Sequence, residues 1–283
     1  MSSQNFLSTM DDSPVTPLTL ICVGSSFAFS GLFYHLHKQK KLEIQKIKET
    51  PKFQANEDLL KVVKASPQKR LQYVAVEGLV QADGTPLASQ YVPRCFGVVQ
   101  KVVVQEHWKI WNPSTRTWTP KKMNTRETCN VVPFSLVSPG AFGSAVSVKV
   151  QSPLEAIGPY LEQVYHRLRH AREGLVDFVV QELSGERPVG LEETEELLRV
   201  GTTLTGFGEV VLEQGRVLRL QPPMDTRPYV LVASDYRGFL QMHQDTATMW
   251  KVLTAIFGLA GAAVLAWVFY REYRKHESRR GRD

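Results

Sequence analysis

Two uncharged apolar runs near the ends of the chain constrain its fold more than any other feature. They cover residues 18–36 and 252–270 of 283. An α-helix rises about 1.5 Å per residue, so each run is long enough to cross a hydrocarbon core of about 30 Å. The sequence therefore predicts two transmembrane helices, with 38–250 as the stretch able to build a hydrophobic core. The remaining segments are two tails, at 1–17 and 271–283.

Positive charge gathers next to both apolar runs. The formal net charge is +6 at pH 7, and the two clusters consist of Lys38, Lys40, Lys41, Lys46 and Lys48 after the first run and Arg271, Arg274, Lys275, Arg279, Arg280 and Arg282 after the second. Basic clusters beside a bilayer attract anionic headgroups, so we expect membrane lipids and not nucleic acid as partners. One cluster lies on the loop side and the other on the tail side, so the positive-inside rule leaves the orientation open.

The first apolar run is interpreted as a retained anchor. Asp11 and Asp12 precede it in place of a basic region, and the run is longer than the apolar part of a cleavable signal peptide. Cysteine is sparse: Cys22 lies in this run, and Cys95 and Cys129 are the loop's two thiols. This usage disfavours a disulfide-stapled ectodomain. Whether the two loop thiols pair stays open, because their separation is unknown.

The loop is predicted to be rich in β-strands. The segment 98–105 is nearly continuous in valine, and it runs into an alternating stretch that ends at Trp111. The turn 112–115 and the returning 117–119 then indicate a hairpin. Valine-rich or alternating patterns predict further strands at 73–80, 131–137, 145–150, 202–212, 216–220 and 229–233.

Helices are expected at four places in the loop. The segment 38–52 continues the first span until Pro51 ends it, and Asn56 is placed to cap a short helix that extends to Val63. Apolar residues at helical spacing predict a helical insertion over 154–172, and 235–244 is expected to be a helical stalk. The pattern leaves 175–183 open between helix and strand, and 193–200 is equally ambiguous. The fold class is therefore α+β, a β-rich domain with a helical insertion bracketed by two transmembrane helices.

Few residues suggest chemistry, and none is assigned a catalytic, cofactor-binding or metal-binding role. His166 and His170 are four apart on the predicted helix, but arginines flank them, which favours a solvated basic face over a metal site. Glu106 and His107 lie in a predicted strand, which directs neighbouring side chains to opposite faces. No serine, cysteine or threonine lies in a recognisable nucleophile motif.

Three further patterns favour packing over ligand binding. Gly206 and Gly208 precede a strand, which indicates a bulge or a close backbone approach and not a phosphate loop. The tryptophans at 108, 111 and 118 are expected to pack across strands. In the apolar runs, small residues four apart permit helix contact, either between the two spans or between protomers, and these are Gly24 with Ala28 and Gly258 with Ala262.

Several stretches together resemble one family. They are YVAVEG at 73–78, VQEH at 104–107, NVVPF at 130–134 and SGERP at 184–188, continued by ETEE at 193–196, GTTLTG at 201–206 and LQPP at 220–223. These resemble the GIDE, or beside-a-membrane, domain family of mitochondrial outer-membrane ubiquitin and SUMO ligases that activate NF-kappaB signalling. The likeness covers nearly the whole chain, spans included.

The resemblance implies two spans in the mitochondrial outer membrane, with both termini in the cytosol and the GIDE loop in the intermembrane space. In that family the ligase activity resides in a cytosolic RING after the second span. A RING needs eight Cys and His ligands for two zinc ions, whereas His276 is the one potential ligand after the second run in these residues. We therefore expect no zinc cofactor in this chain.

The sequence leaves two functional hypotheses. The first is a RING-less GIDE protein that acts as a binding or regulatory module in mitochondrial dynamics or signalling, and that forms homo-oligomers or hetero-oligomers with RING-bearing relatives through its spans or its loop. The alternative is a member of the E3 ubiquitin ligase family, with roles in ubiquitination, fission, apoptosis or NF-kappaB signalling, whose RING lies on a longer product.

Overall fold

A computed structural model describes residues 17–140, 146–170, 185–213, 215 and 217–280. The chain divides into two compact units. One consists of Met1–Glu49 with Leu240–Asp283, and the other is Thr50–Phe239. The predicted segment 175–183 and residue Ser184 lie outside the described residues.

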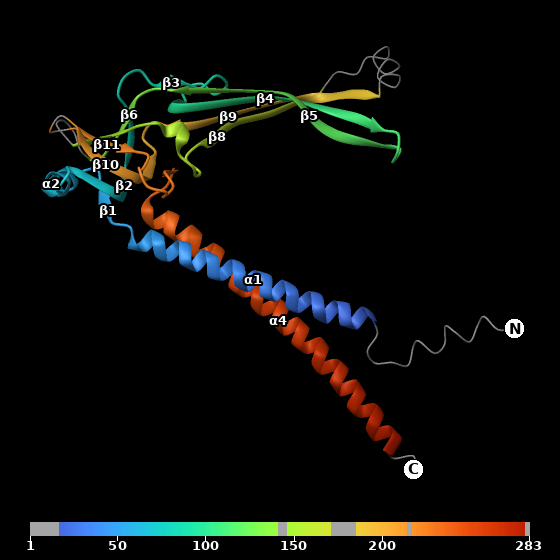
Figure 1. Cartoon of the computed structure of the whole chain (residues 1–283). Coiled ribbons are helices and arrows are strands. Elements are labelled where there is room, and N and C mark those ends of the chain that lie inside the picture. Colours follow the sequence, from blue (N-terminus) through green and yellow to red (C-terminus); the bar gives the residue numbers. More distant parts are fainter. Residues whose placement is uncertain (1–16, 141–145, 171–184, 214, 216, 281–283) are drawn as a thin grey trace. The chain divides into compact units, whose positions relative to one another are not determined.

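The first unit is a pair of long helices (Figure 1). Helix α1 spans Pro17–Glu49 and helix α4 spans Tyr236–Arg280. Both are long and apolar enough to cross a membrane, as the two runs predict. Helix α1 continues past the first run and ends just before Pro51, where the ring of proline prevents further helix. The expected stalk at 235–244 forms the first turns of α4.

The second unit is β-rich, which confirms the α+β class with two apolar terminal helices. One of its two sheets has seven strands, in the order β1-β2-β6-β7-β11-β10-β12, and β2 also pairs with β10. These strands are β1 Lys52–Gln54, β2 Arg70–Ala82, β6 Phe134–Val137, β7 Ser147–Val150, β10 Thr203–Glu213, β11 Val217–Gln221 and β12 Val230–Val232. The extra pairing joins β2, β6, β7, β11 and β10 into a closed barrel.

The hydrophobic core of this unit lies against the barrel strands. Its fully buried members include Phe134, Leu136, Leu204, Leu218 and Leu220. Helix α2, Glu57–Ala65, adds Leu59 and Val63, which share one face at helical spacing. Asn56 caps this helix as predicted, because its Oδ1 accepts a hydrogen bond of 3.1 Å from the Leu59 amide.

Two glycines of β10 allow close packing inside the barrel. A Cβ on Gly206 would lie 2.4 Å from Cδ2 of Leu220, and one on Gly208 would lie 2.7 Å from the Gln221 carbonyl oxygen. The register of β10 against β2 shifts between Gly208 and Val210. Both parts of the prediction, the close approach and the bulge, are confirmed.

The second sheet is a long ribbon, which Figure 1 shows as the strands β4, β5, β8 and β9. Its strands are β3 Leu87–Ala88, β4 Phe96–Asn112, β5 Thr117–Val131, β8 Glu162–His170 and β9 Glu186–Arg199. Strand β4 pairs with β9 along one side and with β3 and β5 along the other. The predicted hairpin is confirmed, with Trp111 opposite Trp118.

The predicted helical insertion over 154–172 is wrong in its described part. Pro153–Glu155 is a single 3-10 turn, and Glu162–His170 is strand β8. Gly158 has a φ of +117° and is followed by proline, which breaks any helix there. Pairing with β9 selects the strand over the helical spacing of the apolar residues. The ambiguous segment 193–200 lies almost entirely in strand β9.

One carboxylate lies where the chain enters and leaves the second unit. Oε2 of Glu77, on β2, is 3.0 Å from Nζ of Lys52 on β1 and accepts a 3.1 Å hydrogen bond from the backbone amide of Tyr236. Tyr236 is the first residue of α4, so Glu77 satisfies an amide that the helix itself leaves unpaired. The Lys52 ammonium also lies 4.9 Å from the Tyr236 ring centroid.

Candidate functional site

The glutamates of β9 alternate between the two faces of the ribbon. Successive side chains of a strand point to opposite sides, so Glu193 and Glu195 share one face and Glu192 and Glu196 share the other. Strand β9 lies between β4 and β8, so both faces place these carboxylates among side chains from neighbouring strands. Two polar clusters result, one buried and one partly exposed.

The buried cluster is centred on Glu195, which has no exposed surface. Its carboxylate accepts hydrogen bonds of 2.6 Å from Ser89 Oγ and from Gln100 Nε2, and one of 2.9 Å from the Gln90 amide. Burial raises the pKa of this carboxyl, but the hydrogen bonds outweigh burial and hold the pKa below its ordinary value. Glu195 is therefore an ionised interior group that fixes the loop after β3.

Two contacts on the same face attach this loop and β8 to the ribbon. The ring of Tyr91 stacks on Tyr165 of β8, with ring centroids 4.3 Å apart and planes 8° apart. Beside them, Nη2 of Arg169 lies 3.2 Å from Oε2 of Glu193. The loop after β3 is thus held by the Glu195 carboxylate and by the Tyr165 ring on the edge strand β8.

The second cluster lies on the opposite face and joins four strands. The Glu192 carboxylate makes hydrogen bonds with Nε2 of His107 at 2.6 Å and with Nε2 of His166 at 2.8 Å. Nζ of Lys122 on β5 lies 3.6 Å from the same carboxylate. Hydrogen bonds from His166 and His107 lower the pKa of Glu192 to about 2.

The structure separates the residues that the sequence singled out as a histidine pair. His166 and His170 lie on a strand and not on a helix, four residues apart on the same face. Four strand residues span about 13 Å, so these two imidazoles do not share one metal ion. Within the described ranges, no group of three or more His, Cys, Asp or Glu side chains is arranged to hold a metal.

Glu106 and His107 behave as the strand prediction requires. Glu106 accepts hydrogen bonds from Trp108 Nε1 at 3.1 Å and from Asn124 Nδ2 at 2.7 Å, while His107 binds Glu192 on the other face. They do not act as one acid and base pair.

A cavity of about 520 Å³ lies on the face of Glu196, nearer the barrel. Its lining includes Lys101, Cys129 and Tyr160, and Nζ of Lys101 lies 3.0 Å from the carboxylate of Glu127. Burial raises the pKa of the Cys129 thiol, which keeps it protonated and weakly nucleophilic at neutral pH. Cys95 and Cys129 are both free thiols.

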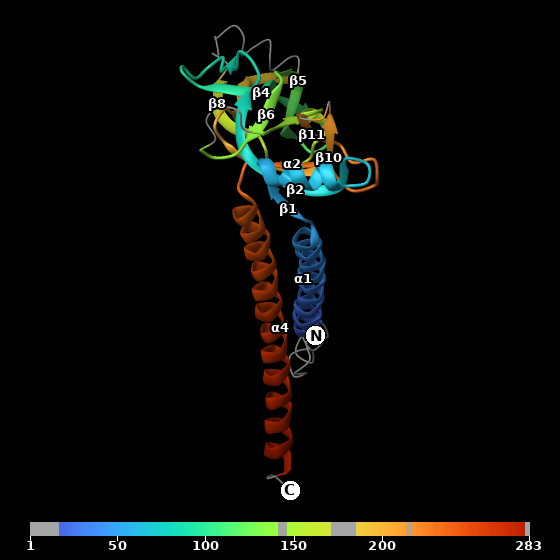
Figure 2. The ribbon, with the colours of Figure 1, turned by 90° about the vertical axis from the view of Figure 1, so that its left-hand side faces the viewer.

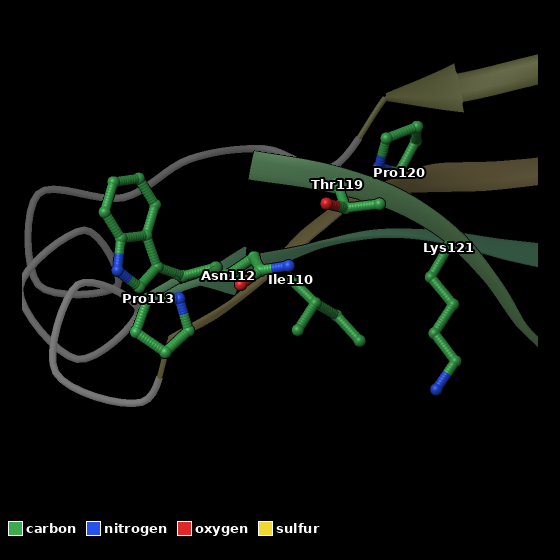
Figure 3. A pocket seen from close by; sticks show the side chains of 7 residues that line it. Ile110, Asn112, Pro113, Thr119, Pro120 and Lys121 are labelled. Atoms are coloured by element: carbon green, nitrogen blue, oxygen red, sulfur yellow. The ribbon is translucent and has the colours of Figure 1, made fainter. Parts of the chain in front are cut away.

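The tip of the ribbon carries the predicted aromatic packing. The rings of Trp111 and Trp118 have centroids 5.4 Å apart and planes tilted by 59°, and the Arg187 guanidinium lies 5.1 Å from the Trp118 ring centroid. Beside them is an open hollow of about 350 Å³, and Figure 3 shows Ile110 and Lys121 among the side chains that line it. Trp108 is turned instead toward Glu106.

The two long helices contact each other through polar and aromatic groups. Ser30 Oγ donates to the Thr254 carbonyl at 3.0 Å, and His37 Nδ1 lies 2.8 Å from the Ala247 carbonyl oxygen. Phe33 lies with its ring centroid 5.6 Å from Trp250 and 5.3 Å from Phe257. Figures 1 and 2 show α1 and α4 side by side along this region.

The small residues of the spans divide into two groups. A Cβ on Gly258 would lie 3.3 Å from Ser30 Oγ, so this glycine is at the contact between the spans. Gly24 would meet nothing within 4 Å. The prediction of helix contact is therefore confirmed for Gly258 within the chain, whereas Gly24 lies outside that contact.

Comparison with known proteins identifies the family. The GIDE family model, described as "E3 Ubiquitin ligase", matches residues 103–266, more than half of the chain. The chain belongs to the GIDE family. The match begins within the ribbon and ends in α4, so it includes Glu192, Glu195 and most of the second apolar run, whereas Ser89 and Gln100 precede it.

Three relatives show how far the similarity of this GIDE chain extends. It is 41% identical to "Mitochondrial ubiquitin ligase activator of nfkb 1-A" of Danio rerio, over 94% of this chain and 76% of that protein. The Homo sapiens "Mitochondrial ubiquitin ligase activator of NFKB 1" is 36% identical, over 92% of this chain and 73% of that protein. The Drosophila melanogaster "Mitochondrial E3 ubiquitin protein ligase 1" is 28% identical, over 92% and 75% respectively. No solved structure matches the chain.

Sequence reasoning missed both carboxylate clusters of the GIDE ribbon. The run Glu192-Glu193-Thr194-Glu195-Glu196 puts acids on both faces, so it shows no apolar alternation and resembles a solvated helix. The signal that could have identified residues 192–196 as a strand is the valine-rich segment 98–105. A strand this apolar needs a pairing partner on each side, and β9 is one of the two.

Proposed function

We propose that this GIDE-family chain is a two-span protein of the mitochondrial outer membrane, whose loop domain is a binding or regulatory module for mitochondrial ubiquitin ligases. The observation that carries this is the organisation of the chain. Two apolar helices contact each other through Ser30 and His37, and the sequence between them, Thr50–Phe239, forms a compact domain. The names of two relatives, mitochondrial ubiquitin ligase activators of NFKB, support a mitochondrial location and a link to ubiquitin ligation. The role in signalling or mitochondrial dynamics is part of the proposal.

The proposed topology places the loop in the intermembrane space and both termini in the cytosol. Two spans put both termini on one side. Basic clusters lie beside both spans, so the positive-inside rule does not choose a side, and the proposal takes the orientation that the GIDE resemblance implies. Protease protection of a C-terminal tag in isolated mitochondria tests this. We expect the tag to be lost before the outer membrane is ruptured, whereas a tag inserted at Gly84 should be lost only after rupture. Survival of the C-terminal tag in intact mitochondria would refute the topology.

The proposed role for these 283 residues is binding and not catalysis. They contain three cysteines and seven histidines, and the described part holds no metal-binding group of three such side chains. A RING requires eight ligands in two zinc sites. We therefore expect purified chain of residues 1–283 to form no polyubiquitin with E1 and a panel of E2 enzymes. Zinc-dependent polyubiquitin would show this wrong.

Mixed oligomers with RING-bearing relatives give the regulatory role a physical route. Gly24 and Gly31 face no atom within 4 Å among the described residues, so a second helix has room to approach that side of α1. Co-immunoprecipitation with a tagged RING-bearing relative in the same membrane tests this route. Gly24→Leu is expected to weaken recovery several-fold, and equal recovery of the variant would exclude this face.

The alternative is that the chain functions as an E3 ubiquitin ligase. The description of its family, "E3 Ubiquitin ligase", favours this reading. Transcript evidence for coding sequence after Asp283 distinguishes the two, because a ligase needs a RING in the same or in an associated polypeptide.

A further inference from the structure

One face at the outer end of the ribbon combines two tryptophans with three cations. Lys109 lies opposite Arg187 on β9, and Trp111 lies opposite Trp118 on β5. Residues opposite each other in register share a face, and so do residues two apart along one strand. Lys122, opposite His107 and four residues from Trp118, is therefore on the same side. We term this surface the Trp-basic face, and it consists of Lys109, Trp111, Trp118, Lys122 and Arg187.

The geometry of the Trp-basic face leaves its aromatic and cationic groups accessible. Trp111 is 38% exposed, and the side chain of Lys122 is 60% exposed. The Arg187 guanidinium lies 5.1 Å from the Trp118 ring centroid, within the range of a cation–π contact. The outer end of the ribbon thus presents a broad amphipathic surface.

Among the residues that the structure describes at this end of the ribbon, acidic side chains lie away from the Trp-basic face. The hairpin 109–122 contains four positive residues and no negative ones. Glu186 lies opposite Ile110, on the other face. The described carboxylate at the edge of the Trp-basic face is that of Glu192, which lies 3.6 Å from Lys122 and also binds two histidines. The charge of this surface is therefore positive, and its complement is a negative surface.

We propose that the Trp-basic face docks on an anionic phospholipid bilayer. Indole rings favour the interface between headgroups and acyl chains, where an apolar body and a polar N–H are both satisfied. Lysine and arginine beside such rings attract anionic headgroups. The turn 112–116 is polar, so the hairpin rests at the interface and does not span the bilayer. This inference does not depend on the regulatory role or on the topology proposed above.

The test uses the full chain in nanodiscs of phosphatidylcholine, so that its spans are satisfied in a neutral bilayer. These nanodiscs are mixed with dense vesicles of phosphatidylcholine alone or with cardiolipin, and co-sedimentation is measured. We expect binding only to the anionic vesicles. The double variant Lys109→Glu with Lys122→Glu should reduce binding by about tenfold or more, because two attractive charges become repulsive. The matched control Lys149→Glu, an exposed lysine on β7, should bind as the parent chain does.

Tryptophan quenching distinguishes docking by the Trp-basic face from attraction of the vesicles to the basic segments near the spans. In a chain with Trp108, Trp250 and Trp267 replaced by phenylalanine, brominated lipid in the vesicles should quench the remaining two tryptophans. Absence of quenching, or unchanged binding by the double variant, would overturn the proposal.

Two other ligands could explain binding to this face. Competition by inorganic phosphate at low concentration would assign the site to free phosphate. Binding of polyglutamate without quenching would assign it to acidic proteins, and either outcome rejects the bilayer. Circular dichroism of each variant confirms that the sheet is retained.

Discussion

The carboxylate of Glu195 on β9 accepts a 2.6 Å hydrogen bond from Nε2 of Gln100 on β4, in a part of the ribbon where Glu195 has no exposed surface. Gln100 in turn accepts a hydrogen bond of 3.1 Å from Asn130 on β5. This chain of polar groups crosses three strands in the order β5, β4, β9. An interior carboxylate with a full set of donors fixes the register of the ribbon, because a slip by one residue would bury the charge without partners.

Replacement of Glu195 by alanine is expected to destabilise the loop domain by about 3 kcal/mol, because buried donors of Ser89 and Gln100 lose their acceptor. Urea unfolding of the full chain in nanodiscs, followed by tryptophan fluorescence, measures the change. Hydrogen exchange should also show faster opening of the backbone at 89–95. The control Glu162→Gln removes an exposed ion pair with Arg199 and should cost under about 0.5 kcal/mol.

Glu192 is expected to make stability depend on pH in the acid range. Its pKa is about 2 in the folded protein, below the ordinary value of 4.5, so the unfolded chain binds this proton first as pH falls. The stabilisation is complete above the ordinary value and is lost as pH falls toward 2. Glu192→Gln should flatten that part of the profile of urea midpoint against pH.

Glu213→Gln serves as the matched variant for that profile, since it also removes an ion-paired carboxylate, from Arg219. It should retain the slope between pH 4.5 and 2 that Glu192 produces. A parent-like slope in Glu192→Gln would contradict the assignment.

Gly206→Ala is expected to destabilise the barrel by about 2 kcal/mol, because the added methyl would lie 2.4 Å from Leu220 in a closely packed interior. The comparison is Gly84→Ala, where a Cβ meets nothing within 4 Å. Thermal unfolding of the two variants in parallel measures the difference. Equal midpoints would show that the barrel relaxes around the new methyl group.

The contact between the spans is expected to fail in Gly261→Leu. A Cβ there would already lie 3.2 Å from the Phe27 ring, and a leucine side chain needs more room. The readout is disulfide cross-linking between cysteines placed at Ser30 and Thr254, in a background without the native cysteines. Gly24→Leu, where the Cβ has no neighbour, should leave cross-linking within the chain unchanged.

The sequence predicts those parts of the fold that local patterns decide. The two apolar helices follow from their length, the cap at Asn56 from its side chain, and the hairpin at 112–115 from its turn residues. In each case neighbouring residues supply the deciding energy. Gly206 and Gly208 are a different case, because they lie inside β10 and their close neighbours, Leu220 and Gln221, come from β11.

The sequence fails where distant pairing decides the structure. Leu161, Val164 and Leu168 have helical spacing, and only pairing with the edge of β9 makes this segment a strand. The sites centred on Glu192 and Glu195 depend on residues more than 80 positions away, His107 and Gln100 among them. No local pattern contains that information, and neither cluster was predicted.

The position of Glu77 has a mechanical consequence. Its carboxylate is bonded both to Lys52, just after the chain leaves α1, and to the first amide of α4. Tension applied along either span therefore reaches β2 through the same side chain. Because β2 belongs to the closed barrel, such tension is shared around a ring of strands and does not peel one strand from an edge. A force that enters the domain at Lys52 or at Tyr236 thus meets the same carboxylate on β2.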